Sequence, residues 1–468
     1  MRSRLGRLHF FAALAFIAGC ASQPLPTLRA AATPAPAFSQ TAPPSAAAAM
    51  PADGEWWKSF ADPVLDDLVV RAMAANESVD QAGARLQRAS AAVRSAHAAR
   101  GPQAALHGGV IGPSNTSVGD QVSDTSWAGV GIRMSYELDL FDRHGPARQA
   151  ALGDAEVAQA TWRAVRLVVQ ADTVHTYLAL RALESERALL ADDVAGRAEA
   201  LQIAQRQWRH GLISELPLAG LERDLAAARS DAAVLERRQQ ELTHALATLL
   251  GEAPTSWQLP VAAAPWPAAL PGVPAGIPSQ VLARRPDLAA SGHAVRAAQA
   301  RVGAAQSSAL PSVTLTAAGG VAASGLTDLL HQATRMVGVG LLLDLPVFDS
   351  GRRAAATQAA MADLEQSMSV HRERVLTSLR EVEDQLSALQ SAQRQAQAQA
   401  PALAMATRSR EASSSRERRG LAGRPEVLEA RHAEIQQQRI ACQIELAQRQ
   451  GTVALVRALG GGWRSDGA

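Results

Sequence analysis

The sequence has few of the residues on which most catalytic and metal-binding sites depend. Its 468 residues include only two cysteines, Cys20 and Cys442, and its 11 histidines are scattered without the spacing of metal ligands. It contains no zinc-protease HExxH, Walker loop, nucleophile elbow or GxGxxG motif. These absences predict that the chain is not an enzyme and holds no metal or other cofactor.

Aromatic residues and net charge are also scarce. Aromatic residues make up 4% of the chain, and the formal net charge is only +2. A nearly neutral chain of this length argues against a nucleic-acid-binding protein. Long stretches rich in alanine and poor in proline favour helices in close contact. The composition therefore predicts a mainly helical protein.

The N-terminus has the pattern of a bacterial export signal. A basic segment with three arginines precedes an apolar run from 8 to 18, which is too short to span a bilayer as a mature helix. The next residues, ending at Cys20, resemble a lipobox, so we predict a signal peptide at 1–19 and a covalent lipid, such as palmitate, on Cys20. Ala21 after the cysteine favours sorting to the outer membrane. An ordinary signal peptide with a chance cysteine is the alternative.

Regular structure is predicted to begin after an Ala/Pro-rich tether at 20–54. Asp62 has the character of an N-cap, with Pro63 at the first helical position. Three aromatic residues precede this helix, and we expect them to pack against helices; anchoring at a bilayer interface is the alternative. These aromatic residues are Trp56, Trp57 and Phe60.

The rest of the chain contains two related copies of one unit. Residues 84–106 match 293–315, and residues 210–222 match 419–431, both at an offset of about 209 residues. A third block, "LDLFDRHGPARQAA", matches "LDLPVFDSGRRAAATQAA". The predicted domains are a first repeat at 55–260, a linker at 261–277, a second repeat at 278–460 and a tail at 461–468.

Each repeat is predicted to contain a helix, two strands, a long helix, a tight turn and a final helix. The first pair of strands is predicted at 103–112 and 126–140, and the second at 311–321 and 337–345. Between 128 and 138, apolar residues alternate with small or polar ones. Such alternation is typical of an outer-membrane strand, but equally of a soluble half-buried sheet.

The long helices are predicted at 146–210 and 352–419, the second interrupted and kinked at Pro401. Gly211 and Gly420 follow them as C-cap glycines. Each chain then returns on a helix of about 35 residues. Because four strands cannot close a barrel in lipid, spanning strands require an oligomer. The switch from strand to helix would then join a membrane barrel to a helical tunnel.

These features together resemble the outer-membrane factor family of TolC and OprM, and in particular its NodT-type efflux lipoproteins. The resemblance rests on the lipobox, the "WWKSFADPVLDDLV" entry, the two strand-to-helix junctions and the two Gly-Leu tips. It implies transmembrane β-structure in a mainly α fold: a homotrimer with a 12-stranded barrel continuous with a helical periplasmic barrel. It also implies an exit duct for small molecules in the outer membrane of a Gram-negative bacterium. The implied partners are outer-membrane lipid, a periplasmic adaptor and an inner-membrane pump of the RND type.

Two regions are candidate sites under this resemblance. The adaptor is expected to dock at the hairpin tips, although the same residues are also good helix stops. A periplasmic gate is expected near the second tip, with a solvated charged helix face as the alternative. The tip residues are Arg209, Gly211, Leu212, Ser214, Arg419, Gly420, Leu421 and Gly423, and the gate residues are Arg416, Glu417 and Arg418.

The competing hypothesis is a lipid-anchored periplasmic coiled-coil scaffold without a channel. It accounts for the long helices and the lipobox. It does not account for strand pairs that recur at matched positions in both repeats.

Overall fold

The computed structural model describes residues 37–39, 55–118, 121–258, 273 and 278–461. Cys20, the predicted signal peptide and most of the predicted tether and linker lie outside the described residues. The chain divides into two compact units. The sheet unit comprises residues 86–158 and 290–372, and the helical unit comprises the described parts of 32–85, 159–289 and 373–468.

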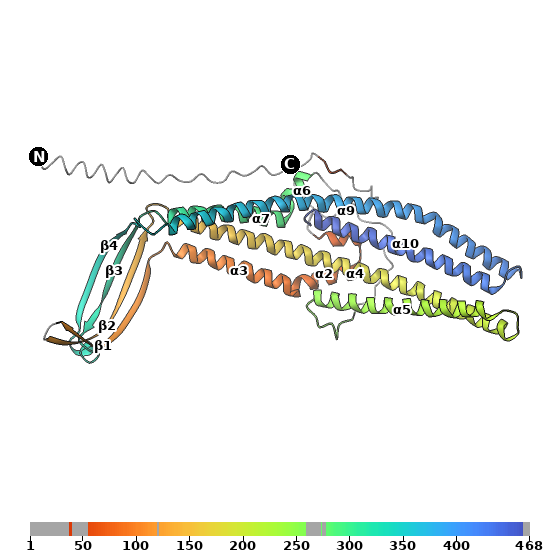
Figure 1. The fold of residues 1–468 in the computed structure, drawn as a ribbon, viewed down its shortest axis with the longest axis horizontal. Helices are drawn as coiled ribbons and strands as arrows, with labels where there is room; N and C mark the ends of the chain where they lie inside the picture. Colours follow the sequence, from red (N-terminus) through yellow and green to blue (C-terminus); the bar gives the residue numbers. More distant parts are fainter. Residues whose placement is uncertain (1–36, 40–54, 119–120, 259–272, 274–277, 462–468) are drawn as a thin grey trace. The chain divides into compact units, whose positions relative to one another are not determined.

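Four antiparallel strands form the sheet, in the order β1-β2-β3-β4 (Figure 1). The prediction of two strand pairs is confirmed, but the first pair is longer than expected. The short helix α8 (Asp328–His331) lies in the connection between the last two strands. The strands are β1 (Gln103–Val118), β2 (Gln121–Leu138), β3 (Ser312–Ala323) and β4 (Thr334–Asp344).

The strand register gathers apolar side chains on one face of this sheet. Antiparallel partners share a face, so the apolar residues of neighbouring strands fall mainly into the same cross-strand rows. One such row is Leu106, Ile132, Gly319 and Val337. This apolar face is exposed to solvent in the single chain; the side chain of Val337, for example, is 88% exposed. The alternation predicted along one strand therefore extends over all four.

The opposite face of the sheet is built mainly from small and polar residues, with Met336 and Leu342 on β4, and includes glycines where two strands approach closely. A Cβ atom on Gly320 would lie 2.6 Å from the carbonyl oxygen of Val130, and one on Gly131 would lie 2.9 Å from that of Gly319. Both distances are shorter than a real Cβ contact. The β2–β3 pairing, which joins the two halves of the chain, thus requires glycine at these positions.

Aspartates form the turns between strand and helix. The carboxylate of Asp139 accepts a hydrogen bond from the Arg143 backbone N–H at 2.6 Å. In the second half, Asp349 accepts hydrogen bonds from the backbone N–H groups of Gly351 and Arg353 at 3.2 and 3.0 Å. The abrupt change from strand to helix is therefore fixed locally, by an acidic side chain that satisfies turn and helix donors.

The long helices begin at these turns. α4 (Gly145–Arg209) has 65 residues and α9 (Arg352–Arg418) has 67, and both continue from the sheet unit into the helical unit. α9 stays helical through Pro401, and the kink predicted at this residue stays a prediction. A single proline costs one backbone hydrogen bond, which the many remaining turns tolerate. In the described part of the chain, no helix is both long and apolar enough to cross a membrane.

Two shorter helices complete the helical part of the sheet unit. α3 (Glu77–Ala98) and α7 (Pro286–Ser307) precede the two strand pairs. A Cβ atom on Gly153 of α4 would lie 2.9 Å from the Cβ atom of Ala297 of α7, so these two helices pack very closely. A small core of Ala298, Val302, Leu364 and Met368 lies beside this contact.

The helical unit holds the main hydrophobic core. The Asp62 carboxylate accepts hydrogen bonds from the first N–H groups of α2 (Pro63–Ala75), which confirms the predicted N-cap. The hydroxyl group of Tyr177 donates to the same carboxylate at 2.6 Å. The three aromatic residues before α2 are buried in this core, so their predicted packing against helices is confirmed. The core also includes Leu65, Leu68, Leu180, Leu246, Leu386 and Leu455.

Two return helices of equal length lie in this unit. α5 (Glu215–Leu249) and α10 (Arg424–Ala458) each have 35 residues, as predicted. The short α6 (Pro278–Arg284) precedes α7. We call α4 with α5 the first hairpin, and α9 with α10 the second hairpin.

Candidate docking tips and the seam between the hairpins

Both hairpins turn at a glycine in the left-handed conformation, with φ of +69° at Gly211 and +73° at Gly420. The N–H of Leu212 donates to the carbonyl of Gln207, and the N–H of Leu421 donates to that of Arg416, each at 2.8 Å. This pattern is a Schellman motif, which confirms the predicted C-cap glycines. The two leucines that follow are 73% and 66% exposed. Each tip thus presents one apolar side chain to solvent on a rigid turn.

The other predicted tip and gate residues differ in their contacts. Ser214 occupies the N-cap position of α5 without a side-chain capping bond, and Gly423 occupies that of α10. Arg416 pairs with Glu426 across the second tip, and Glu417 lies 3.8 Å from Arg424. Arg418 donates to the Ser414 hydroxyl at 3.2 Å. Two of the three predicted gate residues, Arg416 and Glu417, therefore brace the second tip within one chain.

A ladder of charge pairs joins the first hairpin to the second, and sequence analysis missed it. All its acidic members lie on α4 and all its basic members on α10, about one heptad apart. The heptad spacing of the acidic residues on α4 and of the basic residues on α10 can be read from the sequence. Only the structure shows that these two helices are neighbours. The pairs are Glu186–Arg439 at 2.9 Å, Asp192–Arg431 at 2.5 Å, Asp193–His432 at 2.7 Å and Glu199–Arg424 at 2.7 Å. We call this ladder the seam.

The middle of the seam is the most buried part. Asp193 is 3% exposed and accepts from Nε of Arg197 at 2.9 Å. The His432 ring contacts both groups: its Nδ1 lies 2.7 Å from Asp193, and Nη2 of Arg197 lies 2.8 Å from its ring nitrogens. Glu434, also 3% exposed, lies 2.8 Å from Arg410 of α9. Every buried carboxylate here has a basic partner, as burial of charge requires.

The charge pairs shift the acidity of their members. The hydrogen bond from Arg424 lowers the pKa of Glu199, and the same bond raises the pKa of Arg424. Burial alone would lower the pKa of Arg431, but hydrogen bonds to Asp192 and Glu434 outweigh it and the pKa is raised. Glu199, Arg424 and Arg431 are therefore held in their charged forms near neutral pH.

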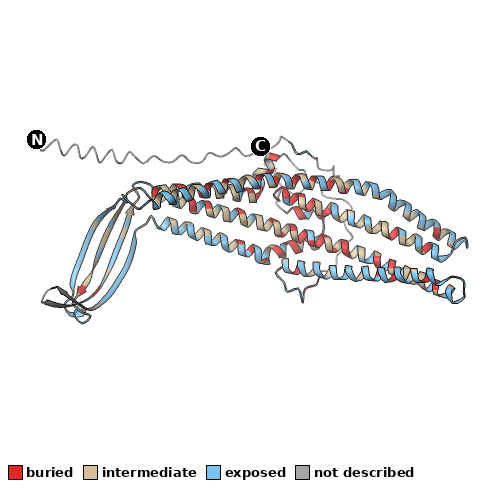
Figure 2. Ribbon diagram, viewed as in Figure 1, coloured by how far each residue is buried: buried red, intermediate tan, exposed pale blue. Residues whose placement is uncertain are grey.

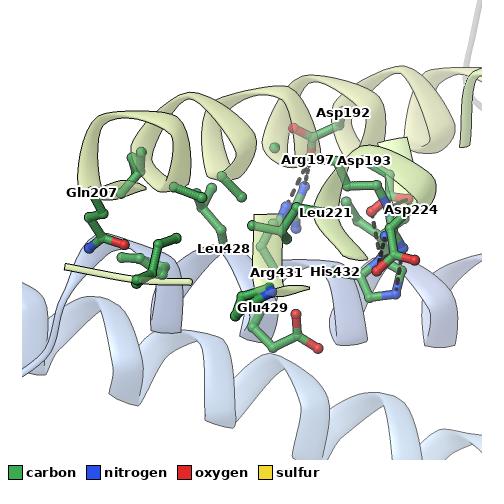
Figure 3. A pocket seen from close by; sticks show the side chains of 18 residues that line it. Asp192, Asp193, Arg197, Gln207, Leu221, Asp224, Leu428, Glu429, Arg431 and His432 are labelled. Carbon is green, nitrogen blue, oxygen red and sulfur yellow. Dashed lines mark hydrogen bonds and ion pairs between the residues drawn. The ribbon is translucent and has the colours of Figure 1, made fainter. Parts of the chain in front are cut away.

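A pocket lies beside the seam, between α4, α5 and α10 (Figure 3). It encloses about 360 Å³ and is lined by residues of both hairpins. Within the described residues, no group of histidine, cysteine or acidic side chains has the arrangement of a metal site. The pocket is therefore a space between three helices, and its wall is partly apolar and partly charged.

These features define the protein's class as that of TolC-like channel protomers: an open four-stranded sheet with an exposed apolar face, and long helical hairpins with glycine tips. The solved structure of the outer-membrane channel OprN is similar, with a TM-score of 0.81 and 25% sequence identity over 94% of this chain and 99% of that chain.

The model of the outer membrane efflux protein family matches residues 68–252 and 277–461, and the chain belongs to that family. It is 30% identical to the pyoverdine export outer membrane protein OpmQ of Pseudomonas putida, over 95% of both chains. It is 27% identical to the cation efflux system protein CusC of Escherichia coli, over 87% of this chain and 88% of that one. The family consists of efflux proteins, so the chain is not an enzyme.

Proposed function

We propose that this protein is the outer-membrane exit duct of a tripartite efflux system, a passive conduit for small molecules. The observation that carries the proposal is the exposed apolar face that all four strands share. In water such a face would favour aggregation, whereas in a bilayer it is the lipid-contacting surface of a barrel. Membership of the outer membrane efflux protein family supports the same conclusion.

Three copies of the chain would complete the duct. Strands β1 and β4 are the edges of an open sheet, and unpaired edges are not tolerated in lipid. A homotrimer of four-stranded sheets gives 12 strands, an even number within the range of known barrels. The two hairpins of each chain would likewise supply their four helices, α4, α5, α9 and α10, to a periplasmic barrel.

The hairpin tips are the proposed docking site for the periplasmic adaptor. Their supporting features are the two exposed leucines, Leu212 and Leu421, on turns that glycine holds in one conformation. The inner-membrane pump, proposed to be of the RND type, would supply the energy. Arg416, Glu417 and Arg418 stay the proposed gate residues, since three copies would bring like charges close together.

The protein is proposed to reside in the outer membrane of a Gram-negative bacterium, with lipid on Cys20 as a second anchor. The names of two relatives indicate the breadth of cargo: one exports pyoverdine and another belongs to a cation efflux system. We therefore propose small-molecule export for this chain, with selection made mainly by the pump.

The first test is the mass and shape of the protein purified in detergent, from light scattering and negative-stain images. A hollow threefold cylinder of about three chain masses would support the duct. The matched control is Cys20→Ser, which removes the lipid and should leave a trimer that still needs detergent. A monomer or solid rod that is soluble without detergent after this substitution would favour the anchored scaffold instead.

A further inference from the structure

The pocket beside the seam has the dimensions of a small-molecule site. Its volume of about 360 Å³ falls within the range of known ligand pockets. It lies wholly in the helical unit, and its walls come from α4 and α5 of the first hairpin and α10 of the second (Figure 3). A ligand bound here would therefore contact both hairpins.

One wall of this pocket is apolar. Leu221 of α5 and Leu428 of α10 are only partly buried and both line the space. Ile203 and Ala204 of α4 and Ile435 of α10 complete this wall. Such side chains suit a ring or a short alkyl chain, whose burial is favourable in proportion to the apolar area removed from water.

The remaining lining carries an excess of negative charge. Four carboxylates face two guanidinium groups, and one of these, Arg431, is shared with Glu434 outside the pocket. The carboxylates are those of Asp192, Asp193, Asp224 and Glu429. The carboxylates and guanidinium groups of the lining together sum to a charge of minus two, which complements a cation.

Two of these carboxylates, Glu429 and Asp224, have no close basic partner within the pocket lining itself. Glu429 is exposed, and among the described residues its side chain makes no hydrogen bond or ion pair. Its side chain extends from α10 in Figure 3 without a dashed partner. Asp224 is paired with its exposed neighbour Arg223 at 2.8 Å and lies at 4.0 Å from Arg197. Exposed pairs of this kind are weak and exchange readily.

We propose that this pocket binds a small organic cation with an apolar body, such as an aryl-alkyl amine. Glu429 and Asp224 would receive the cationic group, while Leu221 and Leu428 would contact the apolar body. Because the carboxylates belong to different hairpins, the ligand would bridge them. The site lies within one chain, so it can be measured whether or not the proposed duct function is correct.

The test uses the full-length protein in amphipol, with Cys442→Ser and a new cysteine in the pocket lining, Ala200→Cys. The rate of maleimide alkylation of this cysteine is measured with 4-phenylbutylamine or with 4-phenylbutyrate, which has the same body and the opposite charge. We expect the amine to slow alkylation at least threefold and the carboxylate to have no effect. The control cysteine, Val234→Cys on the exposed part of α5, should react equally in all cases.

The charge dependence gives the second readout. Glu429→Gln and Asp224→Asn change exposed side chains, and each should raise the amine concentration needed for protection by about fivefold. Equal protection by both compounds would overturn the cationic assignment, and no protection by either would overturn the site. Protection by an arginine-containing helical peptide but not by the amine would also overturn it, and would make the pocket a protein contact.

Discussion

The sheet unit and the helical unit contain similar apolar residues, but the helical unit buries them and the sheet unit exposes them. In the helical unit Leu386 and Leu455 are fully buried, whereas in the sheet unit Leu341 and Val337 are 65% and 88% exposed. Figure 2 shows the same contrast, with buried positions concentrated in the helices and the strands mainly exposed. The helical unit thus buries its apolar side chains in a core of its own. The apolar face of the sheet has no such cover within the chain and requires an apolar environment.

The largest effect is expected in the helical core. Leu386→Ala should lower the free energy of unfolding by about 2–5 kcal/mol, because it leaves a cavity in close-packed surroundings. The matched change Leu341→Ala in the sheet should cost less than about 1 kcal/mol. Urea unfolding followed by circular dichroism measures both. Equal losses would mean that the sheet also has a buried apolar core.

The next prediction separates the two faces of the sheet. Leu341 and Leu342 are adjacent in β4 and similarly exposed, at 65% and 60%, but they lie on opposite faces. Leu341→Arg should cost about 2–4 kcal/mol if its face contacts lipid, while Leu342→Arg should cost less than about 1 kcal/mol. The measurement is the stability of the protein refolded into lipid vesicles. If the two variants behave alike, the apolar face does not contact lipid.

Glycines distinguish the units at a smaller scale. Gly320→Ala should destabilise the sheet by about 1–3 kcal/mol, because the new methyl group meets the backbone of β2. Gly211→Ala has open space but a positive φ, so it should cost about 1 kcal/mol. Gly220→Ala, in open space within α5, should instead stabilise by about 0.5–1 kcal/mol. Thermal unfolding of the three variants compares them, and a stabilising Gly320→Ala would refute the close strand contact.

The smallest effect concerns acid stability in the helical unit. Burial alone would raise the pKa of Asp287, but its hydrogen bonds and ion pair with Arg285 at 2.8 Å lower it overall. The stabilisation from this pair is therefore present above the unfolded pKa, near 3.8, and is lost as the pH falls through the lower folded value. Asp287→Asn should flatten the unfolding free energy between pH 4 and about pH 2. An unchanged acid profile in this variant would show that other carboxylates set it.

Much of the fold was predictable because its signals are local. The long helices, the 35-residue return helices and the C-cap glycines follow from side-chain periodicity and from single residues whose conformation is restricted. The alternation along β2 likewise predicted its two faces. The extent of α9 was also predictable, because a single proline does not end a helix that continues over many more turns.

The sequence by itself determined the duplicated order of elements, the hairpin tips and the apolar alternation, since each depends on neighbours within a few residues. Only the tertiary structure decided the strand register that joins four alternating strands into one apolar face. It also decided that α4 and α10 are neighbours, which turns separate charges into the seam and creates the pocket. These features depend on residues far apart in the sequence, such as Asp192 and Arg431, which are 239 positions apart. No periodicity along one segment specifies which distant segment will pack against it.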